Sequence, residues 1–159
     1  MSYEMPFEHF DPENPDDRPV PGKYHVLIQS VDDADPEKSI TVDYEILAGS
    51  VPNQEGKTGR EYLSRSPKAA KRVALFSVAT GIADIKAMIE AKRNGTPYSL
   101  DLGKAEGRQC VVELVKKDQY VNWSFQGVWP VDDEAVKDVP KNEGMIGQTG
   151  GGDDDETPF

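Results

Sequence analysis

Reactive and metal-binding side chains are scarce in this sequence, which has one cysteine and two histidines among 159 residues. The lone Cys110 cannot form an internal disulfide and fits a reducing, cytoplasmic compartment. Neither His9 nor His25 has a cysteine or carboxylate at a metal-ligand spacing, which argues against a zinc site. The glycine-rich signatures of phosphate and dinucleotide binding are also missing. We therefore expect no metal, no cofactor and no enzymatic activity.

Long hydrophobic runs are missing as well. No stretch of about 18 apolar residues occurs, so a membrane span is not expected. The chain starts Met-Ser-Tyr-Glu, without the basic and apolar segments of a secretory signal. Hydrophobic residues make up 36% of the sequence, which is low for a fully globular chain. These features predict one compact domain with polar extensions.

Positive charge is in short supply overall, but the deficit is local. The net charge is −11, yet residues 23–130 hold 15 basic and 14 acidic residues, a net of +1. Residues 1–22 contribute a net of −5 and residues 131–159 a net of −7. The acidity therefore lies in the two ends, a distribution typical of acidic interaction tails, and the nearly neutral middle does not exclude a nucleic-acid ligand.

The composition predicts three regions. Residues 1–22 form an acidic, proline-rich arm that cannot pack as a regular element. Residues 23–130 form the folded domain. From Asp132 to Phe159 the hydrophobic periodicity is lost and glycine becomes frequent, so we expect residues 131–159 to be a flexible tail.

Within residues 23–130 the pattern alternates with period two and then switches to a helical period. In Ser39–Leu47, for example, Ile40, Val42, Tyr44 and Ile46 share one face, whereas His25 in the first strand is expected on the solvent side. Ser66-Pro67 is typical of a helix start and Gly81 of a helix end. The expected strands are Tyr24–Val31, Ser39–Leu47, Lys57–Ser64, Arg108–Lys116 and Gln119–Trp129, and the expected helices run from Pro67 to about Thr80 and over Ala83–Arg93.

This order predicts a mainly β, α+β fold: a five-stranded Greek-key barrel of the OB type with a helical insert between the third and fourth strands. A half-open sandwich built from the same elements is the alternative. OB barrels bind oligonucleotides across their second and third strands, and binding a single strand requires cations for the phosphates and aromatic rings for the bases.

Cations are concentrated around the third strand. The candidate DNA-binding cations there are Lys57, Arg60, Arg65, Lys68, Lys71 and Arg72, against one acid, Glu61. The spacing of the last three places them on one helix face. Lys116 and Lys117 in the final hairpin are further candidates. An ordinary solvated surface is the competing explanation for both groups.

Two rings are candidates for stacking on bases. Tyr62 alternates with Leu63, so it is exposed if Leu63 is buried. Trp123 shares a face with Val121 and Phe125, a set that favours the core, yet a partly exposed indole could still contact a base. Tyr44 and Phe76 are expected in the core.

The sequence ends in an acidic run followed by proline and phenylalanine, Asp153-Asp154-Asp155-Glu156-Thr157-Pro158-Phe159. This acidic tip resembles the C-terminal tail of bacterial single-stranded DNA-binding proteins, with Glu156 and Thr157 departing from that pattern. The resemblance implies that Asp153, Asp154, Asp155, Pro158 and Phe159 bind partner proteins. A tail that only solubilises the chain is the alternative.

The segments Phe10-Asp11-Pro12, Pro21-Gly22-Lys23-Tyr24 and Gly59-Arg60 resemble a family of phage-encoded proteins found beside replication and recombination genes. Together the two resemblances imply a single-stranded DNA-binding protein of replication, recombination and repair in the cytoplasm of a bacterial host. It would bind without sequence specificity and could form homo-oligomers. Because a flexible linker joins the acidic tip to a basic surface of opposite charge, we also expect the tip to occupy the basic groove when DNA is absent. An adaptor or inhibitor that mimics the host protein's tail is the alternative.

Overall fold

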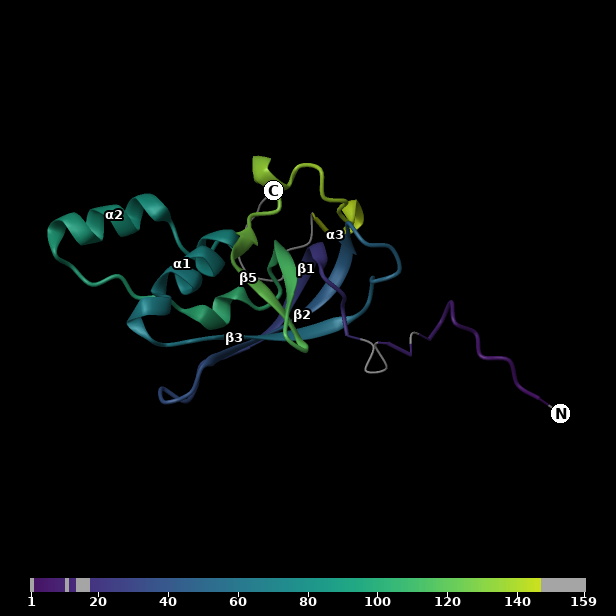
Figure 1. Cartoon of the computed structure of the whole chain (residues 1–159). Helices are drawn as coiled ribbons and strands as arrows, with labels where there is room; N and C mark the ends of the chain where they lie inside the picture. The colour runs from purple at the N-terminus through teal and green to yellow at the C-terminus, as the bar shows by residue number, and fades with distance from the viewer. Residues whose placement is uncertain (1, 11, 14–17, 147–159) are drawn as a thin grey trace.

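The computed structural model describes residues 2–10, 12–13 and 18–146 (Figure 1). Five strands form a single antiparallel open sheet in the order β3-β2-β1-β4-β5. They are β1 (Gly22–Asp32), β2 (Ile40–Gly49), β3 (Thr58–Leu63), β4 (Gln109–Lys117) and β5 (Tyr120–Trp129). The described part of the chain is therefore mainly β with a few helices, an α+β fold, and its strands lie where the alternating pattern predicts them.

Strand β2 shows why the pattern predicts the fold. Ile40, Val42, Tyr44 and Ile46 are buried, whereas the intervening Thr41, Asp43 and Glu45 are only half-buried. Because successive side chains of a strand point to opposite faces, one face of β2 supplies the core and the other faces outward. The inner face carries most of the large buried side chains, including Tyr24, Ile28 and Leu114 of the neighbouring strands.

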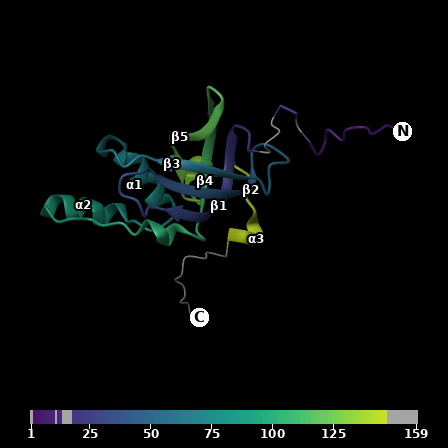
Figure 2. The same cartoon turned by 90° about the horizontal axis from the view of Figure 1, so that it is seen from below.

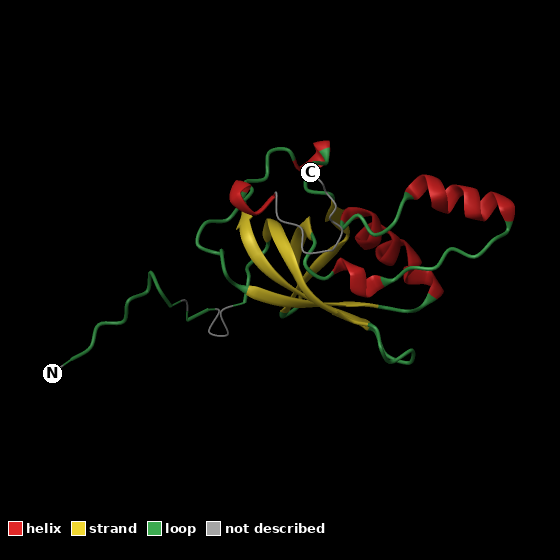
Figure 3. Cartoon of the chain, turned by 180° about the vertical axis from the view of Figure 1, so that it is seen from behind, coloured by secondary structure: helices red, strands yellow, loops and turns green. Residues whose placement is uncertain are grey.

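The helical insert follows β3 and lies on the opposite side of the molecule from the N-terminal arm (Figure 2). It comprises the short 3-10 helix η1 (Pro67–Ala69), α1 (Ala70–Ala79) and α2 (Ile85–Asn94), followed by η2 (Leu102–Ala105). Ser66 caps the first turn and the backbone is left-handed at Gly81, as predicted. Helix α1 packs on β5, while α2 lies farther out (Figure 3). Within the described residues, no helix is long and apolar enough to cross a membrane.

The two edge strands, β3 and β5, are joined through side chains. Glu61 of β3 points inward and is 3% exposed, and its carboxylate accepts a hydrogen bond from the backbone N–H of Trp123 at 3.0 Å. Arg72 of α1 forms an ion pair with the same carboxylate at 2.8 Å. Burial raises the pKa of Glu61, and the contact with Arg72 opposes that rise. The buried carboxylate thus takes the place of ladder bonds between the sheet edges.

A four-residue bulge in β5 changes which of its side chains reach the core. Leu114 pairs with Trp123 but Val112 pairs with Val128, so residues 124–127 lie opposite Glu113 alone. Gly127 is required there, because a Cβ atom would collide with the Ser124 side chain. Phe125 is 53% exposed as a result. The prediction that it shares a buried face with Trp123 is therefore wrong.

The segment after β5 also differs from the sequence expectation. A flexible tail was expected from Asp132, yet the described residues 131–146 pack on the outer face of β1 and β4 through η3 (Glu134–Val136) and α3 (Glu143–Ile146). Val136 and Val139 are buried against Val111 and Trp129. This outer-face cover forms a second, smaller core.

The outer-face cover also buries His25, which is 0% exposed, so the prediction that it faces solvent is wrong. Its Nδ1 accepts from the backbone N–H of Asn142 at 3.1 Å, and its Nε2 lies 2.8 Å from Oε1 of Gln109. Gln109 in turn donates to the carbonyl of Met145 at 2.6 Å. These partners fit a neutral imidazole protonated at Nε2.

Candidate nucleic-acid interface

The outer face of β2 and β3 is open where that of β1 and β4 is covered. On β3, Glu61 and Leu63 point inward, so Arg60 and Tyr62 point outward. Leu63 is 1% exposed and Tyr62 is 57% exposed. The sequence predicted an exposed Tyr62 ring if Leu63 is buried, and Leu63 is buried.

A second exposed ring comes from the other sheet edge. Tyr120, at the start of β5, is 56% exposed. It lines a cavity of about 270 Å³ together with Tyr62, Arg60 and Asn122. Gly59 also lines the cavity and makes room for the hydroxyl of the core residue Tyr44, because a Cβ atom at position 59 would collide with it. The two edge strands thus bring two tyrosines and an arginine to one hollow.

Tyr62 also borders a neighbouring hollow of about 340 Å³ beneath the β1–β2 loop, beside Asp32, Lys38 and Thr41. Arg65 holds that loop in place by donating to the carbonyls of Lys38 and Asp33, both at 2.6 Å. Tyr62 lines both hollows, one at the β1–β2 loop and the other at the start of β5. The two hollows together are called here the tyrosine groove.

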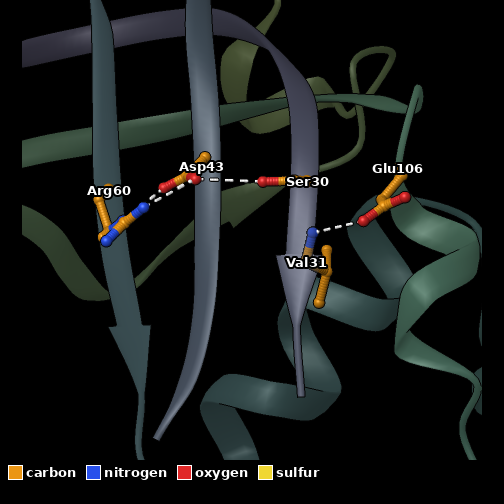
Figure 4. Close-up of polar contacts among 5 residues, drawn as sticks. All are labelled: Ser30, Val31, Asp43, Arg60 and Glu106. Atoms are coloured by element: carbon orange, nitrogen blue, oxygen red, sulfur yellow. Dashed lines mark hydrogen bonds and ion pairs between the residues drawn. The ribbon is translucent and has the colours of Figure 1, made fainter. Parts of the chain in front are cut away.

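Polar side chains cross the strands beside this groove in one row (Figure 4). Arg60 donates two hydrogen bonds to Asp43, at 2.7 and 3.1 Å, and Ser30 donates to the same carboxylate at 3.1 Å. The guanidinium of Arg60 holds the pKa of Asp43 below its ordinary value, and Asp43 raises the pKa of Arg60. Arg60 is therefore fixed in orientation but has part of its charge offset.

The remaining predicted cations lie at three places in the structure. Lys116 and Lys117 are exposed at the end of β4, and Lys117 pairs with Tyr120 in the ladder, which places them beside the tyrosine groove. Lys68 and Lys71 are exposed on η1 and α1. Lys57 is half-buried immediately before β3.

Two predicted contacts are not on the surface. Trp123 is 3% exposed and lies in the core, with ring centroids 5.6 Å from Tyr44 and 5.9 Å from Phe76. The side chain of Arg72 is 19% exposed and is held by its ion pair with Glu61. No role was predicted for Tyr120 from the sequence. A signal was available, because Tyr120 directly follows the predicted hairpin turn and lies between Lys116 and Lys117 on one side and Asn122 on the other.

The predicted partner-binding residues Asp153, Asp154, Asp155, Pro158 and Phe159 lie outside the described residues. In the part of the chain that is described, no three His, Cys, Asp or Glu side chains gather into a possible metal site. Comparisons with known protein families, with curated proteins and with solved structures found no match for this chain.

Proposed function

We propose that this protein binds single-stranded DNA without sequence preference through the tyrosine groove. One observation carries the proposal: Tyr62 and Tyr120, from opposite sheet edges, are both exposed and line the same hollow together with Arg60. Binding a single strand requires flat rings on which bases stack and cations that contact phosphates. Lys116 and Lys117 add positive charge at one end of the groove.

The strand connectivity supports an OB-type barrel that is not fully closed. Strand β1 pairs with both β2 and β4, which leaves β3 and β5 as the edges, and Glu61 and Arg72 join those edges. OB barrels bind oligonucleotides on the face of strands 2 and 3 and on the loops between strands 1 and 2 and strands 4 and 5. The tyrosine groove lies on that same surface.

The acidic tip, residues 153–159, supplies the second part of the proposed function. Its acids would steer it toward basic surfaces and its phenylalanine would enter an apolar pocket. The tip would thereby bring replication, recombination and repair proteins to the coated strand, in the cytoplasm of a bacterial host. The protein itself would perform no catalysis.

The test is equilibrium binding of the full chain to a fluorescent oligo-dT of a few tens of nucleotides, with a duplex of equal length as the control. We expect preference for the single strand and an affinity that falls as salt rises. The slope of log affinity against log salt should be about −0.7 per neutralised phosphate. If no binding occurs at low salt, even after residues 153–159 are removed, the proposal fails.

The charge distribution favours a second candidate, an adaptor or inhibitor that mimics the tail of the host's single-stranded DNA-binding protein. The net charge is −11, and Asp43 offsets part of the charge of Arg60 in the groove itself. Absence of DNA binding combined with capture of a host enzyme that depends on residues 153–159 would identify this function instead.

A further inference from the structure

Helix α2 borders a cavity that the proposed function does not use. The cavity has a volume of about 660 Å³ and opens between η1–α1 on one side and α2 with the following loop on the other. Its lining is largely apolar and includes Ile40, Pro67, Val73, Met88, Ala91 and Leu100. We call this feature the helical groove; α1 and α2, which border it, are seen in Figure 1.

Nothing in the described residues fills this groove. None of the residues of α2 is buried, although Met88 and Ala91 face the groove at helical spacing. Ile85 and Ile89 of the same helix are 54% and 44% exposed. An amphipathic helix normally buries its apolar stripe, and an exposed apolar surface of this kind marks an interaction site.

The charge of the groove defines what fits it. Among its described lining residues, the charged ones are Arg65 and Lys92, both positive. Arg65 uses two of its donors on the carbonyls of the β1–β2 loop, which are neutral groups and leave its charge in place. A fitting ligand therefore combines an apolar side chain with several negative charges.

The chain itself carries such a ligand within reach. Ile146, the last described residue, lines a hollow with Val78 and Ala79 at the end of α1. Residues 147–159 follow it, and thirteen residues extend to at most about 45 Å. Helix α1 has 10 residues, about 15 Å in length, and the helical groove borders its first half. We propose that the acidic tip of this chain, Asp153–Phe159, docks in its own helical groove, with the ring of Phe159 against the apolar lining and the acids beside Arg65 and Lys92.

The helical groove suits the tip better than the tyrosine groove does. The tyrosine groove already contains Asp32 and Asp35, and its Arg60 is paired with Asp43. Docking in the helical groove would hold the tip away from other proteins while the tyrosine groove stays accessible. The inference rests on the shape and charge of the helical groove and does not require DNA binding.

Paramagnetic relaxation in the full-length protein tests this directly. A nitroxide is attached through Thr157→Cys. The native Cys110 is fully buried and burial raises its pKa to about 12, so the introduced thiol alone is labelled. We expect stronger NMR signal loss at Val73, Met88 and Ala91 of the helical groove than at Tyr120 of the tyrosine groove.

Substitutions in the helical groove and in the acidic tip test whether docking depends on specific side chains or whether the tip is only nearby. Lys92→Glu should weaken docking by up to about fivefold, whereas Arg93→Glu, on the same helix but outside the groove lining, should not. Phe159→Ala should weaken it by about tenfold or more. Stronger signal loss at Tyr120 than at Met88, equal effects of the two charge reversals, or no signal loss anywhere would overturn the proposal. A further control mixes chains that carry the nitroxide with different chains whose NMR signals are observed. Signal loss in that mixture would also overturn the proposal, because it would place the tip in the groove of a second copy.

Discussion

The outer surface of this one sheet has a covered half and an open half. Over β1 and β4, residues 131–146 bury His25 and Val111 completely. Over β2 and β3, Arg60 and Tyr62 remain exposed. The covered half carries an apolar side chain and an imidazole that finds its partners within the protein, whereas the open half carries groups that tolerate water. The open half is therefore the accessible one, and it is the half that the proposed function uses.

The largest expected loss of stability comes from removing the buried carboxylate of Glu61, which joins β3 of the open half to β5 and α1. Glu61→Ala leaves Arg72 without its carboxylate and the Trp123 N–H without its acceptor. Removing one partner of a buried ion pair costs about 3–5 kcal/mol, so we expect urea unfolding at pH 7 to show a loss of about 3 kcal/mol. Glu113→Ala, which removes a half-buried hydrogen bond to Ser124, is the control and should cost about 1 kcal/mol. Equal losses in the two variants would contradict the role given to Glu61.

The covered half can be loosened with a smaller change. Val136 is 1% exposed, and Val136→Ala removes two methyl groups and leaves a cavity, at a cost of about 2 kcal/mol. Hydrogen exchange should then accelerate at Val111 and Asn142 but not at Tyr62. The half-buried Val131→Ala is the matched control. Uniform acceleration across the sheet would show that the two halves are not energetically distinct.

The open half is tested by ligand affinity rather than stability. Tyr62→Ala should weaken oligo-dT binding by roughly tenfold, since one stacked base contributes about 1–3 kcal/mol. The midpoint of thermal unfolding should hardly change, because the ring is 57% exposed. Tyr98→Ala, which removes a 37% exposed ring that lines the helical groove, should leave the affinity unaltered. Loss of affinity in both variants would remove the tyrosine groove from the binding surface.

Between pH 7 and pH 5, acid should act on the covered half through His25. Burial lowers the pKa of His25 below its ordinary 6.5, and Lys141 lowers it further, while the bond to Gln109 and the charge of Glu143 oppose the shift. As the pH falls below about 6.5, the unfolded chain takes up the proton before the folded one, so stability decreases. This contribution is absent above that pH. Stability measured from pH 7 to 5 should fall less steeply in His25→Gln, and parallel curves for the two proteins would refute the prediction.

The smallest expected change in stability is at the exposed ion pair. The side chain of Arg60 is 56% exposed and that of Asp43 is 29% exposed, so Asp43→Asn should cost at most about 1 kcal/mol. The same change removes a negative charge from beside the tyrosine groove. We therefore expect a few-fold tighter oligo-dT binding and a steeper salt dependence, which Asp101→Asn should not produce. Weaker binding would mean that Asp43 is needed to orient Arg60.

Local pattern was sufficient for much of the structure. The alternation of Ile40, Val42, Tyr44 and Ile46 determined which face of β2 is buried, because the side-chain period of a strand is fixed by its backbone. Ser66 and Pro67 determined where the helical insert begins. The exposure of Tyr62 followed from the burial of Leu63, and both are set by the same period of two.

The tertiary structure alone decided the rest, because those outcomes depend on contacts between distant residues. His25 is buried by Asn142, which lies 117 positions away in the sequence. Arg72 is held by Glu61, and the bulge in β5 removes Phe125 from the buried face that it was expected to share with Trp123. Tyr120 joined Tyr62 because the sheet edges approach each other. Outside the register shifts of β1 and β5, the sequence pattern determined which face of the sheet a strand side chain points to, and the folded chain determined what it meets there.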